Sequence, residues 1–184
     1  MRRLGSFWLL LVVAIVACAA PAATPEPATE AGSRHGDPEL EALLPATLGG
    51  AALTLESQRG VDLTRESEAL DAFLADLGKG IEDFSLASAY SLAGDIKAQV
   101  GAWRVAGADP EALMPGYIQA VQASSTTPLT VEELLVAGRA VTRIGVPGEL
   151  TQGPIYVFVR GDTLLFVETT DPALADEAIA KLPG

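Results

Sequence analysis

The segment from Ile155 to Thr169 constrains the fold more than any other part of this 184-residue chain. Two runs of β-branched and aromatic residues, Ile155–Val159 and Leu164–Thr169, flank a short polar stretch centred on Gly161-Asp162. Glycine and aspartate suit a tight two-residue turn, so the segment predicts a β-hairpin. The turn also predicts the register, which places Val159 opposite Leu164, Phe158 opposite Leu165, Val157 opposite Phe166 and Tyr156 opposite Val167.

Both faces of this hairpin are apolar, because alternate residues of a strand point to opposite sides. One face carries Val157, Val159, Leu164 and Phe166, and the other carries Tyr156, Phe158, Leu165 and Val167. A single helix layer covers only one face. The second must meet another sheet, helices from the N-terminal half, a partner or an apolar ligand. Burial of the second face within the chain is favoured. The face formed by Val157, Val159, Leu164 and Phe166 is the candidate surface for an apolar ligand or an interaction partner.

Helices are expected at four places. Three begin with an Asp-Pro pair, at Asp37-Pro38, Asp109-Pro110 and Asp171-Pro172. Aspartate accepts the unpaired amides of a first helical turn, and proline needs no donor there. The fourth has apolar residues at helical spacing, at Leu70, Phe73, Leu74 and Leu77. The helix after Asp109 contains Pro115 and Gly116, which allows either one helix or two short pieces.

Strand-like runs lie between these helices, at residues 51–57, 84–90, 96–105 and 134–144. The last two contain glycines, which suggest β-bulges. With the hairpin, the element order is roughly αβαββαβββα. Neighbouring strands are expected to pair antiparallel, with the helices on one face. The predicted fold class is therefore α+β, a single two-layer domain in which a mainly antiparallel sheet packs against about four helices.

The N-terminus carries the features of a secretory signal: Arg2-Arg3, an apolar run from Phe7 to Ala17, and small residues before Cys18. A bilayer-spanning helix needs about 20 apolar residues, and this run is shorter. The residues Ile15-Val16-Ala17-Cys18 resemble the lipobox of bacterial lipoproteins. The alternative is an ordinary cleaved signal in which Cys18 is incidental.

The resemblance implies cleavage before Cys18, attachment of diacylglycerol and at least two acyl chains to it, and a lipid anchor in the cell envelope. Residues 1–17 are then the signal peptide, 18–36 a flexible tether rich in proline, alanine and threonine, and 37–184 the globular domain. The domain is expected on the extracytoplasmic side, at the outer leaflet of the cytoplasmic membrane or at an outer membrane. His35, the only histidine, falls in the tether and is expected to be solvated.

Charge excludes some partners. The chain has a net charge of −12, and removal of residues 1–17 takes away two arginines and no acids, which leaves about −14. An acidic domain with no basic patch is not expected to bind nucleic acid. Anionic lipid would repel it, so the lipid anchor and not electrostatic attraction must hold it at the membrane.

No catalytic residue, metal ligand or cofactor is predicted. The only histidine lies in the tether, and the only cysteine would be acylated. A Ser-His-Asp triad, a Cys-His pair or a cysteine metal site in the domain is thereby excluded. Arg104, Arg139 and Arg143 would form an anion site if their strands brought them together; otherwise they lie on the solvated side of an edge strand.

Three hypotheses for the function follow. The leading one is a membrane-anchored, non-enzymatic lipoprotein whose domain acts as an interaction or accessory module for an envelope protein partner. The alternative is a carrier or binding protein for a lipid or other apolar ligand, held on the face formed by Val157, Val159, Leu164 and Phe166. A carboxylate-dependent hydrolase is the third hypothesis. The many carboxylates of the chain favour it, but the chain has few of the aromatic residues that line sugar sites, which places it last.

Overall fold

The structure is a computed structural model that describes residues 35–64, 67–91, 97–145 and 153–184. Its helices are α1 (Pro38–Glu41), α2 (Glu68–Asp76), α3 (Pro110–Ser124) and α4 (Pro172–Lys181), with 3-10 turns η1 (Gly60–Asp62) and η2 (Ile81–Asp83). Its strands are β1 (Thr47–Leu48), β2 (Ala51–Ala52), β3 (Thr54–Arg59), β4 (Phe84–Tyr90), β5 (Ala98–Val105), β6 (Thr130–Val136), β7 (Arg139–Gly145), β8 (Ile155–Arg160) and β9 (Thr163–Thr169). The predicted α+β class, the antiparallel sheet and the approximate element order are confirmed.

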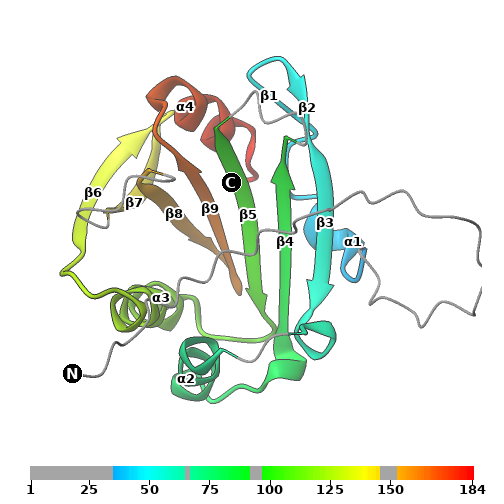
Figure 1. The fold of residues 1–184 in the computed structure, drawn as a ribbon, viewed down its shortest axis with the longest axis vertical. Coiled ribbons are helices and arrows are strands. Elements are labelled where there is room, and N and C mark those ends of the chain that lie inside the picture. Colours follow the sequence, from blue (N-terminus) through cyan, green and yellow to red (C-terminus); the bar gives the residue numbers. More distant parts are fainter. Residues whose placement is uncertain (1–34, 65–66, 92–96, 146–152) are drawn as a thin grey trace, which may run out of the picture. The chain divides into compact units, whose positions relative to one another are not determined.

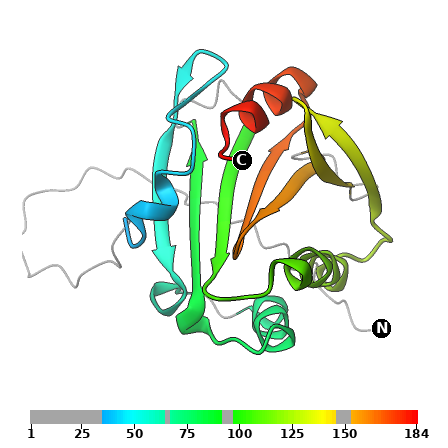
Figure 2. The ribbon, with the colours of Figure 1, turned by 180° about the vertical axis from the view of Figure 1, so that it is seen from behind.

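Seven strands form the main sheet in the order β3-β4-β5-β9-β8-β7-β6, and every neighbouring pair is antiparallel. Strands β3 and β6 lie at the two opposite edges (Figure 1, Figure 2). The predicted register of the β8–β9 hairpin is confirmed at all four pairs: Val159–Leu164, Phe158–Leu165, Val157–Phe166 and Tyr156–Val167. A two-residue turn and two apolar strands were therefore enough to define this part of the sheet.

The three Asp-Pro helix starts are also confirmed. Asp37, Asp109 and Asp171 each accept an amide of the following turn, and proline occupies the first turn of each helix. The acceptor distances are 3.1 Å to Leu40 N, 3.0 Å to Glu111 N and 2.9 Å to Ala173 N. Each aspartate thus satisfies an amide that a helix leaves without a partner, which fixes where the helix begins.

Helices pack on both faces of the sheet, whereas the sequence analysis predicted them on one face only. Leu40 of α1 and Ile179 of α4 pack with Val100, Leu165 and Val167, on what we call the α4 face. Helices α2 and α3 pack on the opposite side, called the α3 face, through Phe73, Leu74, Leu113 and Tyr117. The reason is the hairpin itself, because both of its faces are apolar and both require cover. Cover by helices from the N-terminal half was one of the expected alternatives, and it is met only in part, because α2 comes from that half but α3 does not.

Trp103 of β5 is the centre of the core on the α3 face. Four aromatic rings surround it, at centroid distances of 5.6 Å for Phe84, 5.4 Å for Tyr117, 6.2 Å for Phe166 and 6.4 Å for Phe73. The contacts of Phe84, Tyr117 and Phe166 are edge-to-face, a geometry that adds to the free energy of apolar burial. The aromatic residues of the chain are few, and the fold gathers five of them at one point.

The expected β-bulges are not found at the two glycines. At Gly101 the β4–β5 and β5–β9 ladders continue without interruption. A Cβ at this position would lie 2.2 Å from Cζ of Phe166, so the glycine makes room for that ring. Gly138 lies instead in a two-residue turn with Ala137, and both have positive φ, so the run 134–144 is a hairpin and not one strand.

Helix α3 is continuous, although it contains Pro115 and Gly116. Pro115 removes only one helical hydrogen bond, and the tight packing of α3 against α2 and the sheet holds the rest together. A Cβ at Gly116 would come 3.1 Å from Cε2 of Phe73, so this glycine lets α2 approach α3 closely. The two-piece alternative is therefore wrong.

Polar residues near the start of the described domain form a cluster of Asp37, Arg104, Ser57, Glu41 and His35, which we call the Asp37 cluster. Asp37 pairs with Arg104 of β5, and its amide donates to Oγ of Ser57 at 2.8 Å. Ser57 in turn donates to Glu41 at 2.5 Å, and Glu41 is 3.0 Å from Nδ1 of His35. The sequence analysis assigned His35 to the solvated tether. Its side chain is exposed, but it contacts the Glu41 carboxylate of α1, and its main chain forms an isolated β-bridge with Ser57 of β3.

Candidate functional site

The β6–β7 hairpin diverges from the rest of the sheet. Strand β7 pairs with β6 along its whole length, but with β8 over only three residue pairs, from Thr142–Val157 to Ile144–Ile155. Residues 139–141 of β7 and 158–160 of β8 lie beyond that ladder. The two strands therefore share one end and separate toward the other, which opens the sheet between them.

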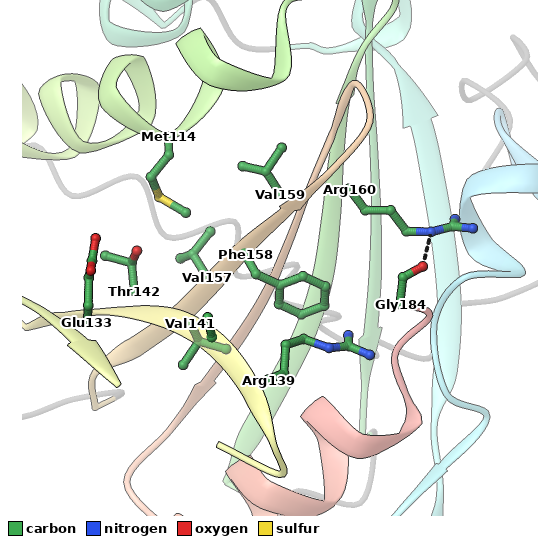
Figure 3. Close-up of a pocket in the computed structure, with 11 residues that line it drawn as sticks. Met114, Glu133, Arg139, Val141, Thr142, Val157, Phe158, Val159, Arg160 and Gly184 are labelled. Atoms are coloured by element: carbon green, nitrogen blue, oxygen red, sulfur yellow. Dashed lines mark hydrogen bonds between the residues drawn. The ribbon is translucent and has the colours of Figure 1, made fainter. Parts of the chain in front are cut away.

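A cavity of about 600 Å³ lies where the strands separate (Figure 3). Val157 and Val159 of β8 form one side, Thr142 of β7 forms the other, and Met114 reaches in from α3. The full lining is Met114, Glu133, Arg139, Ala140, Val141, Thr142, Val157, Phe158, Val159, Arg160 and Gly184. The volume falls in the range of natural small-molecule sites, and most of the surface that lines the cavity is apolar.

A second cavity of about 610 Å³ adjoins the first and shares Met114, Glu133 and Thr142 with it. It lies between α3 and the β6–β7 hairpin. Its lining is Met114, Pro115, Ile118, Gln119, Gln122, Leu129, Val131, Glu133 and Thr142. We call the two cavities together the hairpin groove. The groove runs from the opening between β7 and β8 along the α3 face to the edge strand β6.

Two arginines flank the end of the groove beside the C-terminal residues. Arg139 donates to the carbonyl oxygens of Leu182 at 3.1 Å and Pro183 at 3.0 Å, and its guanidinium carbon lies 4.4 Å from the ring centroid of Phe158. Arg160 donates through Nε to the main-chain oxygen of Gly184 at 2.7 Å. The segment 182–184 thus links the two separated strands on the α4 face.

The four predicted face residues do not stay together. Val157 and Val159 line the hairpin groove. Leu164 is completely buried in the core on the α3 face, and Phe166 lies over Gly101 against Trp103. The larger part of the predicted face is thus packed within the chain. The anion site is not formed either, because the three arginines have separate partners: Asp37 for Arg104, Glu132 for Arg143 and residues 182–183 for Arg139.

Sequence reasoning missed Met114, Glu133 and Thr142, which both cavities share. None of them belongs to a motif. Their proximity depends on how far β7 separates from β8, and on the position of α3 over that gap. The one local signal was Met114 itself, because a flexible thioether side chain often lines an adaptable surface.

Among the carboxyl groups that the structure describes, Glu168 of β9 is the one whose pKa is raised strongly by burial, to about 7. Glu168 lies two residues after Phe166 on the same strand, so both side chains point to the α3 face. Burial also raises the pKa of Tyr117, and the negative charge of Glu168 adds to that shift. A carboxyl group with a pKa near neutrality exchanges a proton at physiological pH. Glu168 does not line either cavity, so this property is not part of the groove.

The remaining site predictions concern the anchor and metal ions. Cys18 and the whole signal and lipobox lie outside the described residues. Across the described ranges, no helix combines the length and apolar character needed to span a membrane. Within the same part of the chain, no group of three or more histidine, cysteine, aspartate or glutamate residues is placed to bind a metal ion.

No family model matches the chain, and no curated protein or solved structure shows significant similarity to it. The function is therefore inferred from the geometry and chemistry of the hairpin groove.

Proposed function

We propose that this chain is a membrane-anchored extracytoplasmic lipoprotein whose α+β domain is a non-enzymatic interaction module, and that the hairpin groove receives its envelope partner. The separation of β7 from β8 is the observation that supports this most, because it leaves apolar side chains from three elements around an open groove. At the centre of the sheet, by contrast, helices pack on both faces. An apolar concavity with a few polar groups is typical of a binding site.

The anchor has a direct test. Cells that express the full chain are labelled with radioactive palmitate, alongside Cys18→Ser. We expect label and membrane association for the unchanged protein, and loss of both for the variant, because two acyl chains give stable anchoring. Equal labelling of the two proteins would contradict the lipobox assignment.

The groove has a separate test. A photoreactive amino acid is placed at Met114 of the full chain in its own host, since both cavities share this residue. Val61 is the matched control, because it is 58% exposed and lies in η1 outside the groove. We expect Met114 to give a defined cross-linked species that Val61 does not give. If the two positions yield the same products, the groove is not the binding surface.

A carrier for a lipid or other apolar ligand is the second candidate. The observation in its favour is the lining of the first cavity, where Val157 and Val159 stand beside Phe158. Native mass spectrometry of the full protein, extracted gently from its own membranes, should then show an added mass that denaturation removes. Val159→Asp should abolish it and Val61→Asp should not. Added mass that both variants retain would argue against a ligand in this groove.

A further inference from the structure

Strand β6 presents a free main-chain edge. It is the last strand of the sheet, and no other described strand pairs with its outer side (Figure 1). The two-residue turn at Ala137-Gly138 makes Val136–Arg139 a hydrogen-bonded pair, so even-numbered residues of β6 direct their amides and carbonyls to β7. The amides and carbonyls of Val131, Glu133 and Leu135 therefore point outward, where a further strand would bond.

The side chains of those three residues share the α3 face, because they pair with Ile144, Thr142 and Ala140 of β7. Val131 is 45% exposed and Leu135 is 75% exposed, which makes them two of the three large apolar residues exposed in the described chain. Glu133 stands between them and is also exposed. The edge thus displays an apolar, acidic, apolar pattern on one face.

Charge distinguishes Glu133 from its neighbour Glu132. On the α4 face, Glu132 pairs with Nη1 of Arg143 at 3.0 Å. No cation among the residues that the structure describes pairs with Glu133. Opposite charges directly across an antiparallel pair are favourable, and like charges are unfavourable. A strand added to this edge would therefore gain from a lysine or arginine opposite Glu133.

The same rule disfavours a second copy of this chain as the occupant. A symmetric antiparallel β6–β6 pair that matches Val131 with Leu135 places the two Glu133 carboxylates opposite each other, which is destabilising. Acidic side chains at a free edge commonly prevent such self-association. The partner must therefore differ from this chain in the residue that it places at the centre.

We propose that β6 accepts an extended segment of a partner protein as an eighth, antiparallel strand, with a basic residue opposite Glu133 and apolar residues opposite Val131 and Leu135. The proposal rests on the interaction function and specifies the partner's chemistry. Val131 and Glu133 also line the second cavity with Ile118 and Gln122 of α3. The added side chains would therefore extend the wall of the hairpin groove, so edge pairing and groove contact would occur together.

The test uses the full chain, labelled with ¹⁵N, and two capped heptapeptides of alternating sequence. Both carry threonine at odd positions and valine at the second and sixth; the central residue is lysine in one and glutamate in the other. We expect millimolar lysine peptide to shift the amide signals of Val131, Glu133 and Leu135, and to bind about fivefold more tightly than the glutamate peptide. Glu133→Lys should reverse this preference, and Asp176→Lys on α4, which makes the same change in net charge, should not.

Equal binding of the two peptides, or no shift at the three edge amides, overturns the proposal. So does a dimer of the full chain that Glu133→Pro abolishes, since that proline removes only an outward amide and the outcome assigns the edge to a second copy. Cross-linking at Met114 separates this inference from the function. If a defined partner is still captured there, only the edge inference fails; if none is captured, the proposed function fails.

Discussion

The two edges of the sheet are built in opposite ways. At the β3 edge, the Asp37 cluster joins α1, β3 and β5 through a chain of hydrogen bonds and an ion pair. At the β6 edge, the hairpin separates from β8, and Val131 and Leu135 remain exposed. The first arrangement holds three elements together, and the second leaves apolar surface exposed, where we propose that a partner binds. Under the proposed function, one edge of the sheet would stabilise the domain and the other would bind the partner.

The substitution with the largest expected effect is Asp37→Ala, which would break the β3 edge. It removes the cap of α1 and leaves Arg104 without its main partner, so we expect a loss of about 2–3 kcal/mol in the free energy of unfolding. Urea denaturation followed by circular dichroism measures this at pH 7. A loss below about 0.5 kcal/mol would mean that the cluster does not stabilise the domain.

The same edge should depend on pH. Although burial opposes it, the Leu40 amide and Arg104 lower the pKa of Asp37 below its usual value. The folded pKa is thus below the unfolded one, so the stabilisation is present above the unfolded pKa and is lost as the pH falls through the folded one. The difference between the unchanged protein and Asp37→Asn should therefore shrink below about pH 4. A constant difference from pH 7 to pH 3 would contradict the charge-based explanation.

Glu168→Gln should have the next largest effect and the opposite sign. The pKa of Glu168 is raised to about 7 by burial, so its ionisation opposes folding. Stability from this residue is present below the unfolded pKa and falls as the pH rises toward 7. We expect the variant to be more stable by about 2 kcal/mol at pH 8, a value discounted for partial exposure, and equal at pH 4. Thermal unfolding at the two pH values is the measurement.

Arg160→Ala should have a smaller effect, because it removes one hydrogen bond that links β8 to Gly184 at the end of the groove. About 1 kcal/mol is expected. Arg59→Ala at the β3 edge is the matched control, since its exposed ion pair with Asp62 joins residues only three apart and should contribute only about 0.3 kcal/mol. A larger loss for Arg59→Ala would reverse the order that the structure implies.

Leu135→Thr should change stability least and binding most. Its side chain is 75% exposed, so the free energy of unfolding should stay within about 0.5 kcal/mol of the unchanged protein. Capture of the partner from Met114 should nevertheless fall several-fold, because an apolar contact beside Glu133 is lost. Unchanged capture would remove Leu135 from the binding surface.

Local signals explain which parts of the fold were predictable. The β8–β9 register followed from Gly161-Asp162, and the helix starts followed from the Asp-Pro pairs. The turn before β7 was missed because Gly138 was interpreted as a β-bulge, and because Ala137 adopts a φ of 50°, which alanine rarely does.

The groove could not be predicted because its causes are not local. Only Val157 and Val159 of the predicted face line it, since Leu164 and Phe166 are packed under α3. The sequence also gave no sign that the β7–β8 ladder would stop after three pairs. That property depends on contacts between distant segments, such as Arg139 with residues 182–183.

Under the proposed membrane anchoring, the position of the Asp37 cluster would also have a mechanical consequence. Tension applied through the residues before Gly36 reaches β3 first, through the Gly36 amide, which donates to the carbonyl of Ser57 at 3.0 Å. Strand β6 is six strand spacings away, about 29 Å along the sheet. The force would act on β3 and α1 at one edge of the sheet. The tether could therefore pull on the domain without deforming the surface at the β6 edge.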